Sequence, residues 1–173
     1  YELIQTWQGF VYHMTCRGSR FKDGAMRNPA GQVFMNGRES SEWLAQNLKS
    51  TRNFIRKWGH MVKHDELMYP IIPPKYDVGF VVHNCDVNML KELEPWCSDI
   101  YGDWVGVNKY IDEEQPNTDF NLSKRIHSDH SDQKNNVIVE FDASKLTSDN
   151  FQILVNLSDI LKESGEVGEM ELE

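Results

Sequence analysis

Cysteine is scarce in this chain of 173 residues, and its three cysteines form no Cys-x-x-Cys pair. An odd, scattered set of thiols argues against a disulfide framework and against a zinc ribbon. Long apolar runs are missing too: no stretch approaches the roughly 18 consecutive apolar residues of a membrane span, and no apolar h-region opens the chain, so neither a membrane span nor a secretory signal is expected. We therefore expect reduced thiols, no transmembrane segment and a cytoplasmic protein.

Charge is present in both signs but is unevenly placed. Residues 1–75 contain 11 Lys and Arg against 6 Asp and Glu, a net charge of +5, whereas residues 76–173 contain 7 against 21, a net charge of −14. A basic first part suits an anionic ligand, and an acidic second part disfavours nucleic acid as a partner. The change coincides with prolines that interrupt regular structure. The sequence therefore predicts two parts, 1–70 and 76–173, joined by a proline-rich linker at 71–75.

The first part contains one clear helical pattern, at residues 39–58. Five residues at helical spacing are predicted to form its buried stripe: Leu44, Leu48, Thr51, Ile55 and Trp58. Asn36 and Glu39 resemble a capping box, Arg56 and Lys57 suit the helix dipole, and Gly59 supplies the stop. Ahead of this helix we expect a short strand at 9–14 and a glycine-containing loop at 16–38. The chain begins with Tyr1 rather than Met, and we expect it to be the C-terminal part of a longer protein.

The second part alternates strand and helix patterns. Strands are predicted at 78–83, within 100–111, at 137–141 and at 167–172, with a polar loop at 112–135. Asp86 is expected to cap one helix, and Thr147 or Ser148 a second that ends at Gly165. The fold class is therefore α/β or α+β. The order β-α-β-β-α-β predicts a ferredoxin-like domain that folds by itself, unlike residues 1–75.

The strongest chemical pattern is F-V-Y-H-M-T-C-R-G-S-R-F-K-D-G, residues 10–24. His13 follows the predicted strand and offers an imidazole to a metal ion, while Arg17, Arg20 and Lys22 offer donors that match phosphate oxygens. These residue types fit a site for a metal-bound diphosphate. A solvated basic loop beside a core histidine explains the same residues, and spacing alone does not decide between them.

Other candidate sites have simpler explanations. His60 and His64 have no third ligand near them in sequence, so scattered surface histidines are expected. The run His127, Asp129, His130 and Asp132 has no calcium-loop register and is read as a solvated loop. The consecutive carboxylates at 112–114 are expected to point in different directions, so they are read as solvated loop residues rather than as a catalytic pair. Cys85 beside His83 is explained by packing, since no orienting partner for a nucleophile is evident.

Two segments resemble a known family. F-V-Y-H-M-T-C-R-G-S-R-F at 10–21, followed by N-F-I-R-K-W-G at 53–59, resembles the C-terminal end of the catalytic domain of family-2-type glycosyltransferases with the GT-A fold. The resemblance covers about residues 1–70. It implies that His13 completes the site of a divalent metal, Mn or Mg, that Arg17, Arg20 and Lys22 lie in the loop that closes over the diphosphate, and that the second segment is the terminal helix. Residues 76–173 look like an appended accessory module.

The resemblance also implies the activity, which is sugar transfer from a nucleotide-sugar donor to a carbohydrate or other acceptor hydroxyl. The chain departs from the family pattern, because the donor-binding half, its D-x-D motif and an upstream acidic base are absent. No catalytic residue is therefore assigned, and the chain is not expected to be active alone. The alternative is a non-catalytic binding or assembly module whose basic loop contacts an anionic partner.

Overall fold

The computed structural model describes residues 41–130, 132–165 and 168, and of Trp43 only the backbone. The chain divides into two compact units, Tyr1–Gln46 and Asn47–Glu173. The helices and strands below belong to the second unit, apart from the first six residues of the first helix.

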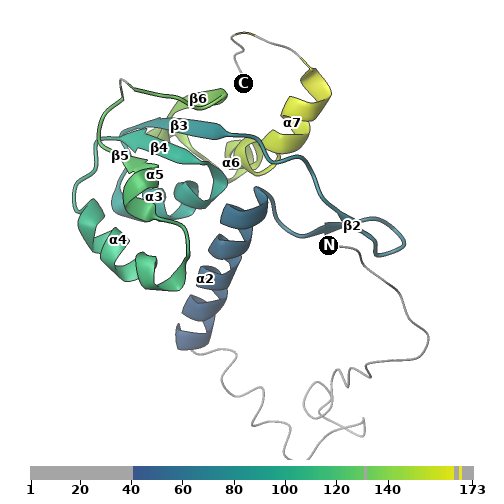
Figure 1. Cartoon of the computed structure of the whole chain (residues 1–173), viewed down its shortest axis with the longest axis horizontal. Coiled ribbons are helices and arrows are strands. Elements are labelled where there is room, and N and C mark those ends of the chain that lie inside the picture. The colour runs from purple at the N-terminus through teal and green to yellow at the C-terminus, as the bar shows by residue number, and fades with distance from the viewer. Residues whose placement is uncertain (1–40, 131, 166–167, 169–173) are drawn as a thin grey trace, which may run out of the picture. The chain divides into compact units, whose positions relative to one another are not determined.

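Short helices and strands alternate along the described chain (Figure 1). The helices are α2 (Ser41–Trp58), α3 (Val87–Leu93), α4 (Val107–Glu114), α5 (Leu122–Arg125), α6 (Ser148–Val155) and α7 (Leu157–Ser164), with 3₁₀ turns η1 (Glu94–Trp96), η2 (Gln115–Asn117) and η3 (Ala143–Lys145). The strands are β1 (Lys63–His64), β2 (Pro70–Ile71), β3 (Val78–His83), β4 (Asp99–Gly102), β5 (Ile126–His127) and β6 (Val137–Asp142).

Four of the strands form one parallel sheet in the order β5-β4-β3-β6. The mixed α/β class is confirmed, as are the strands expected at 78–83 and 137–141. The described strands do not have the ferredoxin-like arrangement, which requires antiparallel neighbours. Helical crossovers are what join parallel strands, and here α3 links β3 to β4 while α4 and α5 lie between β4 and β5.

The core lies on one face of this sheet. Side chains alternate along a strand, so Phe80 and Val82 of β3 face the same way and are fully or almost fully buried. They pack in one cluster with Leu90 and Leu93 of α3 and with Leu154 of α6. The helices that carry these leucines therefore cover the same face.

The opposite face is closed near Gly79 by a polar side chain rather than by a helix. Asn135, from the segment between β5 and β6, accepts a hydrogen bond from the Tyr101 hydroxyl (3.0 Å) and donates to Asp77 (2.7 Å) and Asp99 (2.8 Å). A Cβ on Gly79 would clash with the Asn135 Oδ1 atom. Glycine is therefore required here, because any side chain would displace the amide.

Helix caps follow the sequence closely. Asp86 accepts a hydrogen bond from the Met89 backbone N–H (2.7 Å) and caps α3 as expected. Thr147 forms a capping box with Asn150, so Thr147 rather than Ser148 is the cap of α6. Gly59 and Gly165 have the positive φ of left-handed helix stops, 77° and 59°. The last helical pattern is divided at Asn156 into α6 and α7.

Several expectations differ from the structure or lie outside its description. The predicted polar loop at 112–135 contains η2, α5 and β5, because Leu122 and Ile126 anchor that segment in the core. The strand expected within 100–111 is β4, which ends at Gly102, and α4 begins at Val107. The strands expected at 9–14 and 167–172, the loop at 16–38 and the capping box at Asn36 lie outside the described residues, apart from the single residue Gly168.

Helix α2 buries a different stripe from the one its apolar spacing predicts. Ile55 is buried, but the side chain of Leu48 is 56% exposed and that of Trp58 is 38% exposed. Arg52 and Arg56 are buried instead. Arg56 was expected to suit the helix dipole, and its burial is explained by the carboxylates that it contacts.

Candidate functional site

The residues predicted to bind metal and diphosphate, His13, Arg17, Arg20 and Lys22, all lie outside the described residues. Their roles therefore remain predictions. The same holds for the domain division, in which residues 1–70 and 76–173 are separate parts. The structure adds that residues 47–69 belong to the same compact unit as the sheet.

Within the described chain, the carboxyl edge of the sheet gathers polar side chains. In open parallel sheets, ligands bind outside the carboxyl ends of the strands, where the strand order reverses. Here the order reverses between β3 and β6, because β4 and β5 follow on one side of β3 and β6 lies on the other. The two strand ends are joined by a hydrogen bond from Asn84 to Asp142 (3.0 Å).

Two histidines lie close together at this edge. The rings of His83 and His130 are 5.4 Å apart between centroids. The His83 Nε2 atom is 2.8 Å from a Glu140 carboxylate oxygen, and the His130 Nε2 atom is 4.0 Å from Asp103. Each imidazole therefore lies near a carboxylate, and the His130 Nε2 atom is buried without a hydrogen-bond partner among the described residues.

Neighbouring polar groups at this edge mainly support the backbone. Asn84 has a positive φ of 53°, Asp86 caps α3, and Asp142 accepts hydrogen bonds from the Ser144 backbone and hydroxyl. Burial, together with the charge of Asp86, raises the pKa of the Cys85 thiol to about 12. Because a nucleophilic cysteine needs an accessible thiolate, packing remains the explanation for Cys85.

The histidine-rich run at 127–132 is dispersed rather than gathered. His127 stacks on Tyr101, with centroids 4.7 Å apart, and its Nε2 atom is 2.7 Å from Asp99. His130 turns toward His83, while Asp132 pairs with Lys134 at 2.7 Å. Across 41–130, 132–165 and 168, no group of three or more His, Cys, Asp or Glu side chains is arranged to hold a metal ion.

His60 and His64 have different surroundings. His64 is exposed, as expected for a surface histidine. His60 is 4% exposed, so the expectation of a surface side chain was wrong for it. Its Nδ1 atom lies 2.5 Å from the Met61 carbonyl oxygen and its ring meets Phe54 edge to face.

A buried cluster of ionic groups joins α2 to the sheet domain. Arg56 donates to Glu94 (2.7 Å), Glu114 (2.9 Å) and the Tyr110 hydroxyl (3.2 Å). Arg52 forms a bidentate pair with Glu114, at 2.8 and 2.7 Å. Arg125 Nε lies 3.0 Å from Glu94, without hydrogen-bond alignment, and Arg125 Nη2 donates to the Cys97 carbonyl (2.6 Å).

This cluster shifts the protonation of its members. Burial opposes the ionised form of Glu114, but the hydrogen bonds from Arg52 and Arg56 outweigh burial and hold its pKa below the usual value. Burial and the charge of Glu94 raise the pKa of Tyr110. At neutral pH Glu114 therefore stays ionised and Tyr110 stays protonated, which suits a structural role rather than proton transfer. Sequence spacing alone missed it, although Arg52 and Arg56 lie one helical turn apart.

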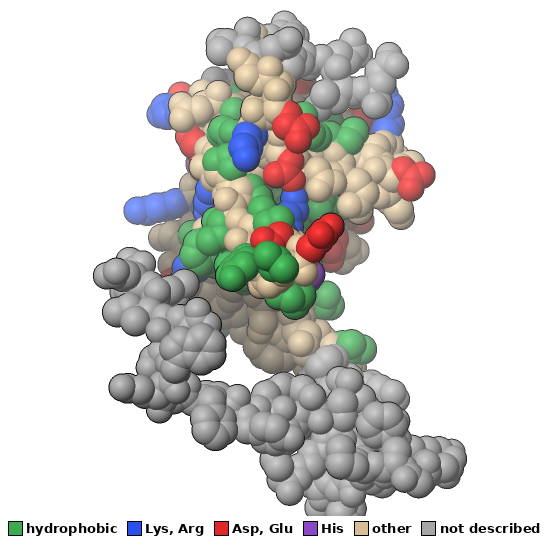
Figure 2. All heavy atoms as spheres, turned by 90° about the vertical axis from the view of Figure 1, so that its right-hand side faces the viewer, with side chains coloured by type: hydrophobic (Ala, Val, Ile, Leu, Met, Phe, Trp, Pro, Cys, Tyr) green, Lys and Arg blue, Asp and Glu red, His purple; other side chains and the backbone are tan. Residues whose placement is uncertain are grey.

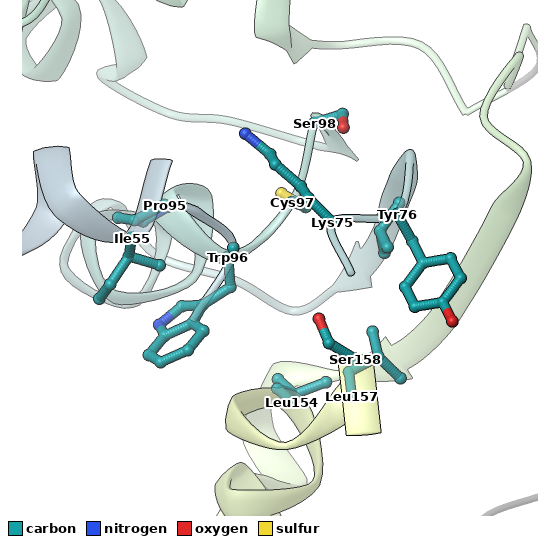
Figure 3. Close-up of a pocket in the computed structure, with 12 residues that line it drawn as sticks. Ile55, Lys75, Tyr76, Pro95, Trp96, Cys97, Ser98, Leu154, Leu157 and Ser158 are labelled. Atoms are coloured by element: carbon teal, nitrogen blue, oxygen red, sulfur yellow. The ribbon is translucent and has the colours of Figure 1, made fainter. Parts of the chain in front are cut away.

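A small pocket lies where α2, η1, α6 and α7 meet (Figure 3). Ile55, Trp96, Leu154 and Leu157 are among its lining residues. Its volume is about 20 Å³, enough for one water molecule. Pockets for small-molecule ligands are larger by at least a factor of about ten. The pocket therefore does not fit a nucleotide sugar.

Two further findings bear on function. No helix in the described part of the chain is both long enough and apolar enough to cross a bilayer. Comparisons of the chain with protein-family models, with curated proteins and with solved structures gave no match.

Proposed function

We propose that this chain is the C-terminal portion of a metal-dependent glycosyltransferase of the GT-A type. The observation that supports the proposal is the pair of segments F-V-Y-H-M-T-C-R-G-S-R-F and N-F-I-R-K-W-G, which resemble that family in order and spacing. The second segment forms the end of helix α2, which stops at Gly59, and this agrees with a terminal helix at that position.

In this proposal the basic loop serves the leaving group. His13 would hold the divalent metal, and Arg17, Arg20 and Lys22 would donate hydrogen bonds to the phosphate oxygens. The bound metal ion would supply Lewis-acid stabilisation of the departing diphosphate. Donors placed where negative charge develops lower the barrier because they need no rearrangement during the reaction. The acceptor hydroxyl and its base would belong to the donor-binding half.

The buried ion cluster connects the sheet domain to the proposed catalytic part. Helix α2 is the terminal helix in the proposal, and its Arg56 is buried against Glu94 and Glu114 of the sheet domain. A buried charge pair tolerates little displacement, because separating the partners leaves an uncompensated charge. We infer that the accessory domain is held rigidly to the terminal helix of the catalytic part.

The reading frame upstream of Tyr1 tests the proposal. A nucleotide-binding β-α-β pattern with a D-x-D motif is expected there. In the complete enzyme, His13→Ala should weaken Mn²⁺-dependent binding of a nucleoside diphosphate in isothermal titration and leave the melting temperature nearly unchanged. An unchanged metal dependence would show that His13 is not a metal ligand. An upstream reading frame without such a domain would contradict the proposed glycosyltransferase function.

The runner-up is a non-catalytic binding or assembly module. Its support is the apolar surface exposed between residues 48 and 72, because large exposed apolar patches mark interaction surfaces. A start codon at the position of Tyr1 would favour this alternative.

A further inference from the structure

Lys75, which lies shortly before strand β3, holds the carboxyl end of helix α2. Its Nζ atom donates hydrogen bonds to the backbone carbonyl oxygens of Arg56 (2.5 Å) and Lys57 (3.2 Å), in the last turn of α2. Carbonyl groups in the last turn of a helix have no partner within the helix, so Lys75 acts as a cap. No carboxylate among the described residues forms an ion pair with the Lys75 ammonium group.

A second cation lies close to Lys75 and is held in place. The centre of the Phe120 ring is 5.7 Å from the Lys75 Nζ atom and 5.2 Å from the guanidinium carbon of Arg125. Arg125 donates to the backbone carbonyl oxygens of Glu94 (3.1 Å) and Cys97 (2.6 Å), which fixes its position. Partial burial and the charge of Arg125 lower the pKa of Lys75. Lys75 therefore gives up its proton more readily than a lysine surrounded by water.

The hydrogen bonds of Lys75 suit a neutral amine as well as an ammonium ion. An ammonium group has three N–H donors, whereas a neutral amine has two donors and one lone pair. The two carbonyl oxygens of α2 take both donors of the amine, so its lone pair stays available for reaction. Lys75 is an exposed residue, and its stem lines the edge of the small pocket (Figure 3). A small reagent can therefore reach it from solvent.

We propose that Lys75 is a modification site for small acyl groups carried on phosphate or on a thiol. A lysine becomes a nucleophile when it is poorly hydrated or lies beside another cation, and both conditions hold here. The Nζ lone pair attacks the acyl carbon and forms a C–N bond. The bond from that carbon to phosphate oxygen or to sulfur breaks, its electron pair leaves with the phosphate or thiolate, and the nitrogen loses one proton to water. The product is a neutral amide.

Acylation would act on the attachment of helix α2. An amide has one N–H donor, so it serves only one of the two carbonyl oxygens that Lys75 now holds. Loss of the positive charge also removes a favourable interaction with the carboxyl end of the helix dipole. Helix α2 carries Arg52 and Arg56 into the buried ion cluster. We therefore expect modification of Lys75 to loosen the helix that this cluster holds.

The test compares Lys75 with a lysine that extends into water. Lys109 is the matched control, because its side chain is 82% exposed. Figure 2 shows several Lys and Arg side chains, in blue, that stand out from the surface in this way. The chain is treated at pH 7 with limiting acetyl phosphate or, in a second arm, with acetyl-coenzyme A, and peptide mass spectrometry follows each site. Lys75 should be acetylated several-fold faster than Lys109 in at least one arm, which identifies the type of donor.

The same labelling in urea shows whether the folded structure is responsible. The two rates should become equal, because the unfolded chain places neither Arg125 nor the end of α2 beside Lys75. A ratio that persists in urea would reflect the local sequence and would overturn the proposal. Labelling of Lys75 no faster than that of Lys109 in both arms of the native experiment would overturn it as well.

Two substitutions test the effect on helix α2. Lys75→Gln lacks the charge, as acetyl-lysine does, and should lower the melting temperature by a few degrees, whereas Lys109→Gln should leave it nearly unchanged. Lys75→Arg keeps the charge and should retain most of the stability. Equal melting temperatures for Lys75→Gln and the unaltered chain would overturn the proposed effect of modification on α2.

Discussion

Arg56 and Glu94 lie 38 residues apart in sequence and form an ion pair at 2.7 Å in which neither side chain is exposed to solvent. The pair joins helix α2 to the turn that follows α3. Removing one member of a buried ion pair strands the other charge in a poorly hydrated site, and the cost exceeds that of losing a surface pair several-fold.

Glu94→Gln is therefore expected to lower the free energy of unfolding by about 3–5 kcal/mol. Urea denaturation at neutral pH measures this. Glu113→Gln is the matched control. Glu113 is exposed, and its ion pair with Lys109 is long, at 3.9 Å. The control substitution should leave the midpoint nearly unchanged. Equal effects of the two substitutions would mean that the buried pair does not hold α2 in place.

The lowered pKa of Glu114 predicts that the free energy of unfolding depends on pH. Because Arg52 and Arg56 lower its pKa in the folded chain, the unfolded chain takes up a proton at higher pH than the folded one. The stabilisation is complete above the ordinary carboxyl pKa of 4.5 and is lost as the pH falls through the lower folded value. Unfolding free energies measured between neutral and acidic pH should therefore fall less steeply in Glu114→Gln than in the unaltered chain. Identical slopes would exclude the pairing.

Thr147 is expected to matter more than its neighbour Ser148. Thr147→Ala removes the acceptor for the Asn150 backbone N–H and should cost about 1 kcal/mol. Ser148→Ala alters an exposed residue in the first turn of α6 and should have little effect. Comparison of the two urea midpoints checks the cap, and a larger loss from Ser148→Ala would reassign it.

Cys85 should be unreactive in the folded chain. Burial and the nearby Asp86 raise its thiol pKa to about 12, so the thiolate is rare at pH 8. Alkylation by iodoacetamide, followed site by site with peptide mass spectrometry, should be slow until denaturant is added. Labelling of Cys85 at the rate of an unfolded control would contradict its burial.

Arg17 and Arg20 carry the prediction for the basic loop. Replacing both with Gln in the complete enzyme should cost on the order of 1–3 kcal/mol of nucleoside diphosphate binding, the usual contribution of hydrogen bonds to charged groups. Lys22→Gln should cost less. An equal loss for a nucleoside without phosphates would mean that the loop acts through folding.

The predicted independence of residues 76–173 is affected by the ion cluster. A fragment that starts at residue 76 keeps Glu94 and Glu114 but loses Arg52 and Arg56. We therefore expect a fragment starting at Asn47 to be more stable than one starting at residue 76.

The sequence by itself determined the local features of the fold. Strands β3 and β6, the Asp86 and Thr147 caps and the stops at Gly59 and Gly165 depend on neighbouring residues, so propensity and spacing predict them. The α/β class follows from the same alternation. The metal and diphosphate residues were likewise proposed from the sequence, on a motif and a resemblance.

The tertiary structure decided which strands pair and which side chains are buried. A strand as short as β5 has too few residues for its sequence pattern to predict which strands it pairs with. The parallel order β5-β4-β3-β6 depends on helices that pack across distant segments. The residues next to Arg56 in sequence predict that its side chain lies on the surface. It is buried because Glu94 and Glu114, far along the chain, supply the charge that compensates it.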